Sequence, residues 1–283
     1  MISFEPKQLF SHSIQNIIFF SALIFSGNFI SLPLFLTSTF GYLLLCVLSS
    51  GIIIFAVSTM NADREQKSFL NIFLSRNVIL CLLIILSVMG IFFSRNSFLG
   101  FLALLYTLIA LSHDLFVKDL VIIDVLGTGI EFSLKAALGA AMINIQISPW
   151  LIICTFLLAL LVSLGQRRNE ITFVNADNQV PRKVLTLYTP QLLDQMIAVV
   201  TSSTILGYSL YTISTHRLKF IHSAYLVYTI PFVLYGIMRF IYLVYTKTMK
   251  RNIEFELLMD KPLLADVVIW LGVLICIILF KTD

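Results

Sequence analysis

Apolar segments long enough to cross a bilayer recur along almost the whole chain. A transmembrane helix needs about 20 mostly apolar residues, with a range near 17–25. Nine segments meet or approach that length: 15–33, 38–58, 77–94, 97–112, 120–143, 147–164, 192–213, 221–245 and 264–281. The pattern predicts an all-α polytopic membrane protein with nine transmembrane helices in a single domain, residues 1–283. Between the third and fourth segments, Ser94-Arg95-Asn96 predicts a tight helix–helix turn.

The composition agrees with this pattern. Of the 283 residues, 59% are hydrophobic and only 12% are charged, and the mean hydropathy is +0.96. A soluble globular domain of this size does not carry so much apolar surface. The four cysteines all lie in apolar segments without a C-x-x-C spacing, so we interpret them as small buried apolar residues. We expect no removable signal peptide at the N-terminus.

Lysine and arginine concentrate on one side of the predicted spans. With a cytoplasmic N-terminus, thirteen of the nineteen lie in cytoplasmic segments and four lie outside. Because basic loops stay in the cytoplasm, we predict a multi-pass protein of the cell (inner) membrane with its N-terminus inside and its C-terminus outside. Three long polar segments, 59–76, 165–191 and 246–263, then become cytoplasmic loops. The formal charge of +4 follows from this bias, so no nucleic-acid partner is indicated.

Three ionisable residues interrupt the segment 120–143. Asp124, Glu131 and Lys135 are spaced seven and four residues apart, so a helix places them on one stripe. A charge at the bilayer centre costs about 2.5–3.5 kcal/mol even on the lenient insertion scale. The stripe therefore predicts a polar cavity inside a helical bundle.

Arginines at the start of the second cytoplasmic loop suggest a phosphate site. Arg167 and Arg168 leave the sixth span, and guanidinium groups suit phosphate and diphosphate oxygens. Their alternative role is to anchor the helix end to lipid phosphates. Arg239, near the cytoplasmic end of segment 221–245, can either reach a phosphate in the cavity or extend to the membrane surface.

Carboxylates after the second span suggest the other half of such a site. Asp63 and Glu65, with the amide of Asn61, offer the oxygen ligands that Mg²⁺ prefers. The alternative is an ordinary solvated loop. Further along, Asp114 and Lys118 are four residues apart and share a helical face, which a simple ion pair explains equally well. We interpret His113 as an interfacial residue.

From about residue 106 to residue 265 the chain resembles the decaprenyl-phosphate phosphoribosyltransferase family, within the UbiA superfamily of intramembrane prenyltransferases. Four motifs carry most of the resemblance: Gly165-Gln166-Arg167-Arg168-Asn169-Glu170, Leu192-Leu193-Asp194-Gln195, Tyr235-Gly236-Ile237-Met238-Arg239 and Asp260-Lys261-Pro262-Leu263. Lys118 and Asp124 match the family's second polar motif, and Lys135 stands where the family usually has Arg.

The resemblance implies a fold, a reaction and a set of site residues. The fold is nine transmembrane helices around a central polar cavity. The reaction moves a 5-phosphoribosyl group from phosphoribosyl diphosphate to a polyprenyl phosphate with Mg²⁺. Asp63, Lys118 and Asp124 would be catalytic, with Asp63 and Asp124 as metal ligands. The implied substrate-binding residues are Arg64, Asp114, Lys135, Arg167, Arg168, Glu170, Arg182, Tyr188 and Arg239.

The first half departs from the family. Of the polar positions in its first, Asp-rich motif, only Asp63 and Arg64 remain. This departure favours an alternative, a catalytically impaired UbiA-like relative that binds lipid or a partner protein. A transporter is a further alternative, motivated only by charged residues within spans. The sequence does not indicate an oligomeric state.

Overall fold

In the computed structural model, the chain forms two compact units, Met1–Ile147 and Ser148–Asp283. The structure describes residues 15–21, 24, 31–64, 76–146, 149–177, 183–214, 223–246, 256–257 and 259–279. Its regular elements in these ranges are all helices. The all-α prediction is therefore confirmed for the described part of the chain.

Six helices among the described residues are long and apolar enough to cross a membrane. They span Leu32–Thr59, Ser97–Leu115, Ile123–Met142, Pro149–Thr172, Pro190–Ile213 and Tyr225–Thr246. A shorter apolar helix covers Cys81–Arg95. These helices support a membrane protein, whereas the number of nine spans stays a prediction, because segments 15–33 and 264–281 lie partly outside the described residues.

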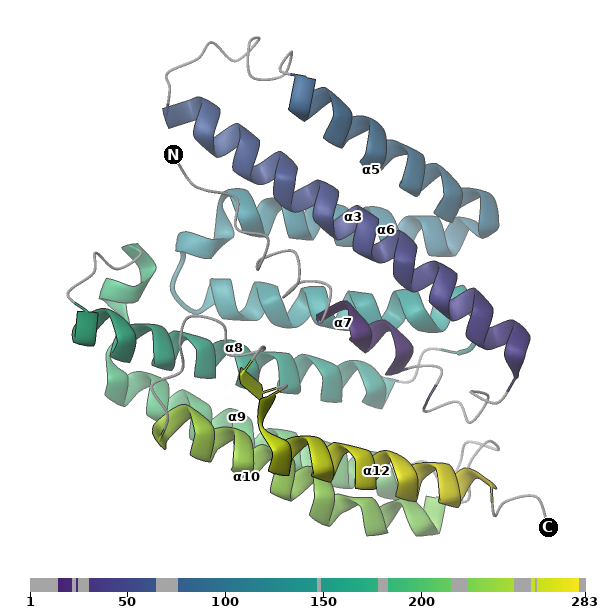
Figure 1. Cartoon of the computed structure of the whole chain (residues 1–283), viewed down its shortest axis with the longest axis vertical. Helices are drawn as coiled ribbons and strands as arrows, with labels where there is room; N and C mark the ends of the chain where they lie inside the picture. The colour runs from purple at the N-terminus through teal and green to yellow at the C-terminus, as the bar shows by residue number, and fades with distance from the viewer. Residues whose placement is uncertain are drawn as a thin grey trace. The chain divides into compact units, whose positions relative to one another are not determined.

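The first unit is built from antiparallel neighbours in chain order. Its elements are η1 (Asn16–Phe20), α3 (Leu32–Arg64), α5 (Arg76–Arg95), α6 (Ser97–Leu115), η2 (Val117–Asp119) and α7 (Ile123–Met142). Helix α3 packs on α5, α5 on α6, and α6 on α7 (Figure 1). The tight turn between α5 and α6 is confirmed: Asn96 is extended and its side chain accepts the Phe98 N–H at 2.9 Å, which caps α6.

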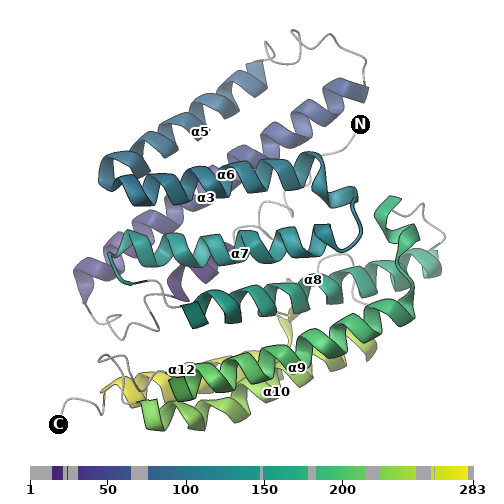
Figure 2. The same ribbon diagram turned by 180° about the vertical axis from the view of Figure 1, so that it is seen from behind.

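The second unit contains α8 (Pro149–Asp177), η3 (Lys183–Leu187), α9 (Pro190–Ser214), η5 (Ser223–Thr229), α10 (Ile230–Thr246) and α12 (Lys261–Leu279). Helices α8 and α9 lie side by side, as do α10 and α12 (Figure 2). Both α8 and α9 begin with proline, whose missing N–H is harmless in the first turn of a helix.

Two helices extend past the ends of the predicted apolar segments, because apolar runs mark the bilayer and not the helix. Helix α3 continues unbroken through residues 34–37, where the first two spans were separated, and extends into the predicted loop 59–76 as far as Arg64. Helix α8 likewise extends to Asp177, well inside the predicted loop 165–191. The only proline near the first break, Pro33, lies in the first turn of α3, where it does not stop a helix.

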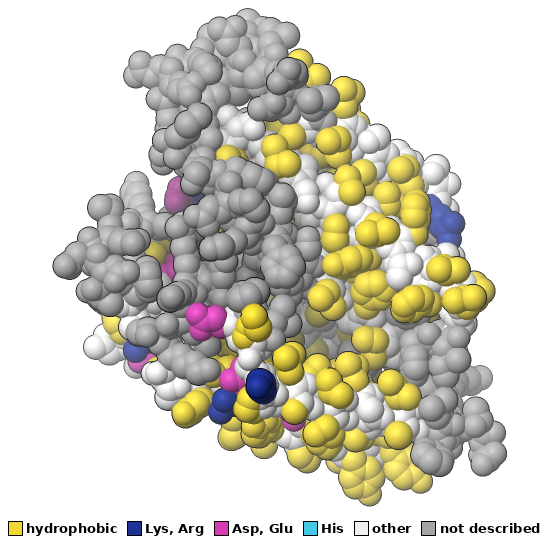
Figure 3. Space-filling view, viewed as in Figure 1, with side chains coloured by type: hydrophobic (Ala, Val, Ile, Leu, Met, Phe, Trp, Pro, Cys, Tyr) yellow, Lys and Arg dark blue, Asp and Glu magenta, His cyan; other side chains and the backbone are white. Residues whose placement is uncertain are grey.

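Large apolar side chains cover much of the described surface of each unit. Phe101 and Leu86 in the first unit and Leu206 and Val268 in the second are more than half exposed. Figure 3 shows hydrophobic atoms spread widely over the described face, with charged atoms confined to small groups. Lipid is the environment in which such a surface is stable, since a soluble monomer exposes only limited apolar patches.

A backbone segment lies directly against helix α7 in the first unit. A Cβ atom added to Gly139 would overlap the carbonyl oxygen of Phe19 in η1, and one added to Gly41 of α3 would come within 2.6 Å of the Phe19 ring. The Asn16 amide of η1 also donates a 2.9 Å hydrogen bond to Ser49 of α3. Two glycines thus let η1 pack against both α3 and α7.

We therefore expect Gly139→Ala to destabilise the protein by about 1–3 kcal/mol, because a rigid backbone group must move to admit the methyl group. Gly90→Ala in α5 is the matched control, since nothing lies within 4 Å of the added Cβ. Alanine there favours the helix by about 0.5–1 kcal/mol. Thermal unfolding of the detergent-purified protein measures both, and equal stabilities of the two variants would contradict this packing.

Candidate functional site

The three ionisable side chains of the α7 stripe are buried within the first unit. Asp124 and Lys135 are 0% exposed and Glu131 is 9% exposed. They therefore contact protein and not lipid, as their cost in a bilayer requires. Lys135 carries its ammonium nitrogen 5.0 Å from the centre of the Phe132 ring and 5.9 Å from that of Tyr106, distances typical of cation–π contacts.

His113 of α6 joins this stripe. Its Nδ1 lies 3.2 Å from Oε1 of Glu131 and 3.9 Å from Oδ1 of Asp114. Its Nε2 lies 3.0 Å from the backbone carbonyl oxygen of Asp124. The sequence suggests an interfacial His113, and the structure places its ring between α6 and two points of α7. We call His113, Asp114, Asp124, Glu131 and Lys135 the α6–α7 cluster.

The position of His113 follows from the connection between the two helices. Val117–Asp119 forms the short η2 turn, and Ile122, with φ 68°, lies directly before α7. A positive φ is unusual for a β-branched residue, so this backbone is strained. His113 and Asp124 lie at similar sequence distances on either side of the η2 turn. Because α6 and α7 run antiparallel, these two residues face each other. Lys118 lies in the turn itself and is partly buried.

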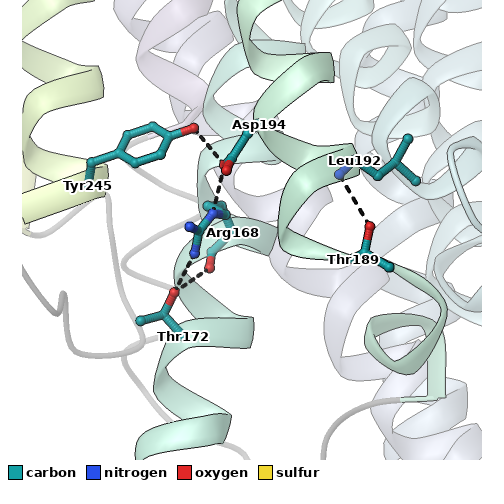
Figure 4. A network of polar contacts seen from close by, with 6 residues as sticks. All are labelled: Arg168, Thr172, Thr189, Leu192, Asp194 and Tyr245. Carbon is teal, nitrogen blue, oxygen red and sulfur yellow. Dashed lines mark hydrogen bonds and ion pairs between the residues drawn. The ribbon is translucent and has the colours of Figure 1, made fainter.

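A second group of polar residues joins three helices of the second unit (Figure 4). Arg168 of α8 donates from Nε to Oδ1 of Asp194 in α9 at 2.8 Å and from Nη1 to the Thr172 hydroxyl at 2.8 Å. The hydroxyl of Tyr245 in α10 donates to the same Asp194 oxygen at 2.7 Å. The guanidinium also lies 5.4 Å from the centre of the Tyr245 ring. A predicted substrate-binding arginine is thus oriented by a carboxylate, a hydroxyl and an aromatic ring.

The start of α9 fixes the position of Asp194. Thr189 precedes the helix, and its hydroxyl oxygen accepts the N–H of Leu192 at 3.2 Å (Figure 4). Threonine commonly caps a helix in this way. Asp194 follows one turn later, within reach of α8.

Two further predicted substrate residues lie on the second unit's helices. Arg167 is buried and forms an ion pair with Glu170 at 3.2 Å on the same helix. Arg239 of α10 makes a two-pronged contact with Asp260, at 3.1 and 2.9 Å. Asp260 also caps α12 by accepting the Leu263 N–H at 3.0 Å. Arg239 therefore pairs with a carboxylate and does not extend alone to the membrane surface.

The remaining predicted site residues are placed as follows. Tyr188 is buried and lies in the short connection that joins η3 to α9 in the sequence. Arg182 lies outside the described residues, and the side chains of Asp63 and Arg64, at the end of α3, lie outside them as well. The structure thus brings Asp114, Asp124 and Lys135 together in one unit, and pairs each of Arg167, Arg168 and Arg239 with a carboxylate in the other.

Among the described residues, no group of three or more His, Cys, Asp or Glu side chains is arranged to hold a metal ion. The described part of the chain therefore does not fit a Mg²⁺ site, and Asp63 is not tested.

Comparison with known proteins identifies the fold. No family model matches the sequence, and no curated protein matches it. The structure is similar to that of a UbiA homologue from Archaeoglobus fulgidus bound to Cd²⁺, with a TM-score of 0.62 and 12% identity over 95% of this chain and 96% of that one. A second structure of a UbiA homologue from the same organism gives a TM-score of 0.58 and 12% identity, with 96% of each chain covered. The chain therefore has the fold of the UbiA homologues.

Two of the carboxylate–arginine pairs of the second unit, Arg239–Asp260 and Arg168–Asp194, predict unequal contributions to stability. Asp260→Asn removes the charge from a nearly buried partner of Arg239, so we expect a loss of about 2–3 kcal/mol. The Asp194 side chain is 39% exposed, so its ion pair with Arg168 is accessible to solvent. We expect Asp194→Asn to lower the free energy of unfolding by less than about 1 kcal/mol. Chemical or thermal unfolding in detergent compares them, and a larger loss in Asp194→Asn would contradict the observed burial.

Proposed function

We propose that this protein is a membrane transferase of UbiA type that moves a 5-phosphoribosyl group from phosphoribosyl diphosphate to a polyprenyl phosphate. The observation that carries the proposal is the buried α7 stripe in a chain with the UbiA fold. Ionisable residues inside membrane helices are expensive and mark substrate sites by default. The motif resemblance supplies the substrates.

The chemistry asks the protein mainly to stabilise negative charge. A phosphate oxygen of the lipid attacks the anomeric carbon of the ribose, the bond from that carbon to the diphosphate oxygen breaks, and diphosphate leaves with the electron pair. An ionised phosphate is already a nucleophile, so no general base is required. Positively charged groups directed at the leaving group lower the barrier.

The side chains of this chain divide that task. Arg167 and Arg168 bind the diphosphate, held in orientation by Glu170 and Asp194. A guanidinium has five N–H donors, more than Asp194 and Thr172 take from Arg168. Within the first unit, the resemblance implies that Lys118 and Lys135 supply further positive charge, that Asp124 orients the ribose and that Asp114 contacts the substrate. Within the second unit, it implies that Tyr188 and Arg239 contact the substrate as well.

Magnesium stays a prediction of the sequence. A UbiA homologue with this fold was bound to Cd²⁺, which supports a divalent-metal requirement for such a reaction. The described residues of this chain do not fit the ion. We therefore assign no step to Mg²⁺, and its ligands would have to include Asp63.

A second candidate function is favoured by the departure of the first half from the family, where only Asp63 and Arg64 of the Asp-rich motif remain. A relative that has lost its metal site would still bind a polyprenyl phosphate or a partner protein without transferring a group. Its arginines would hold the phosphate, and the ion pairs with Asp194 and Asp260 would serve stability alone.

One assay separates the two functions. The purified protein receives labelled phosphoribosyl diphosphate and a polyprenyl phosphate, with Mg²⁺ or with EDTA, beside a working phosphoribosyltransferase as positive control. Labelled lipid that forms only with Mg²⁺ supports the transferase and its metal. Lipid-induced thermal stabilisation without labelled product supports the binding protein, and the absence of both rejects the two proposals.

We expect Asp124→Ala and Arg167→Ala each to lower turnover at least about a hundredfold, because the first removes the group that orients the ribose and the second removes a positive charge that stabilises the leaving diphosphate. Arg95→Ala is the matched control, since Arg95 is exposed at the α5–α6 turn. Turnover of labelled lipid measures all three. Wild-type rates in both site variants would show that the site is assigned to the wrong residues.

The proposed orientation is tested by single cysteines in a cysteine-free background. Asn96→Cys lies at the exposed α5–α6 turn, on the side that we propose to be outside, and Lys261→Cys lies at the exposed start of α12, on the cytoplasmic side. A membrane-impermeant maleimide applied to intact cells should label the first and not the second. The reverse pattern would invert the proposed topology.

A further inference from the structure

We propose that His113 is a positioning residue that holds the Asp124 turn of α7 against α6, with Glu131 fixing the orientation of its ring. The inference deepens the proposed function, and its activity readout rests on that function. His113 and Glu131 are not among the residues that the proposed transferase uses to bind or transfer substrate.

The geometry of the ring supports this role. Nε2 contacts the Asp124 carbonyl oxygen at 3.0 Å, and Nδ1 contacts Oε1 of Glu131 at 3.2 Å. These two points lie two helical turns apart on α7. One rigid imidazole thus touches α7 twice, and it fixes both the distance between the helices and the rotation of α7 about its axis.

Glycine at position 127 makes room for the ring. A Cβ atom added to Gly127 would come within 2.7 Å of Cδ2 of His113. Gly127 lies between the two contact points, so the absence of a side chain there lets the imidazole approach the α7 backbone closely. This position therefore requires glycine for the observed packing, since any side chain would push the ring away.

The contact with Asp124 fixes the donor. The Asp124 carbonyl oxygen can only accept, so in this bond Nε2 carries a hydrogen and donates it. Oε1 of Glu131 lies 3.2 Å from Nδ1 without forming a hydrogen bond among the described residues. The Glu131 carboxyl group therefore acts on the ring through its charge and its proximity.

Other charged groups of the α6–α7 cluster surround this pair. Asp114, next along α6, lies 3.9 Å from Nδ1, and Lys135 follows Glu131 by one turn of α7. Both side chains of the pair are largely shielded from solvent. In such surroundings a misplaced ring shifts the whole Asp124 turn, because the interior is closely packed.

Four variants separate positioning from simple packing. His113→Gln keeps an N–H donor for the Asp124 carbonyl oxygen, whereas His113→Leu removes it at similar volume. Glu131→Gln keeps a polar partner for Nδ1, whereas Glu131→Leu removes it. Ser112→Ala is the matched control on α6, because its exposed hydroxyl bonds only to the Leu108 carbonyl of its own helix.

We expect the two leucine variants to lower kcat by roughly tenfold to a hundredfold with KM for phosphoribosyl diphosphate nearly unchanged, since a small displacement of a reacting group has that effect. The two glutamine variants and Ser112→Ala should retain kcat within about fivefold. Leucine variants with wild-type kcat, or glutamine variants as impaired as the leucine variants, would overturn the proposal.

A spectroscopic measurement tests the contacts of His113 with Asp124 and Glu131, which we call the bridge, without an activity assay. The chain has four histidines, and a comparison of ¹⁵N-histidine spectra of the wild type and His113→Gln in nanodiscs assigns the His113 signals. The bridge requires a protonated Nε2, and Glu131→Leu should shift the Nδ1 signal. An unprotonated Nε2 would overturn the proposal. If the wild type transfers nothing, the proposed function fails while these spectra still decide whether His113 forms the bridge.

Discussion

The structure depends on how charge is accommodated inside an apolar bundle. A charged side chain within a membrane helix is stable only when protein atoms replace the water it has lost. The described helices meet this requirement with pairs: Arg167 with Glu170, Arg168 with Asp194, Arg239 with Asp260, and Glu131 with His113. Three of these pairs join different helices. These charged groups therefore also determine how the helices within each unit pack.

This double role explains why the sequence predicted the candidate site only in part. The α7 stripe was readable because helical spacing alone places Asp124, Glu131 and Lys135 on one face. The role of His113 could not be predicted in that way, because its contact partners belong to the next helix. The short η2 turn was the available signal, since it makes α6 and α7 antiparallel neighbours and brings residue 113 opposite residue 124. The carboxylate partners of Arg168 and Arg239 lie 26 and 21 residues away in sequence, and only the fold pairs them.

The fold class was predictable for a different reason. Apolar length in a bilayer allows few solutions, because every backbone group must be bonded internally, and helices satisfy this within a single segment. Helix ends were less predictable. A hydropathy pattern predicts where a segment leaves the hydrocarbon region of the bilayer. The helix itself can continue into polar sequence, as α8 does up to Asp177. The family resemblance and the structural similarity agree on the UbiA fold, although the sequence identity of 12% is too low for the fold to identify a substrate.

The contact between η1 and Gly139 constrains the order in which the protein is assembled. Residues 16–20 leave the ribosome more than a hundred residues before the surface they pack on, since their main partner is α7. Chains are made at about 5–20 residues per second, so this segment waits several seconds for its partner during synthesis. The amino-terminal segment therefore docks last in its unit although it is translated first, and a chain arrested before residue 139 lacks the helix that would hold it.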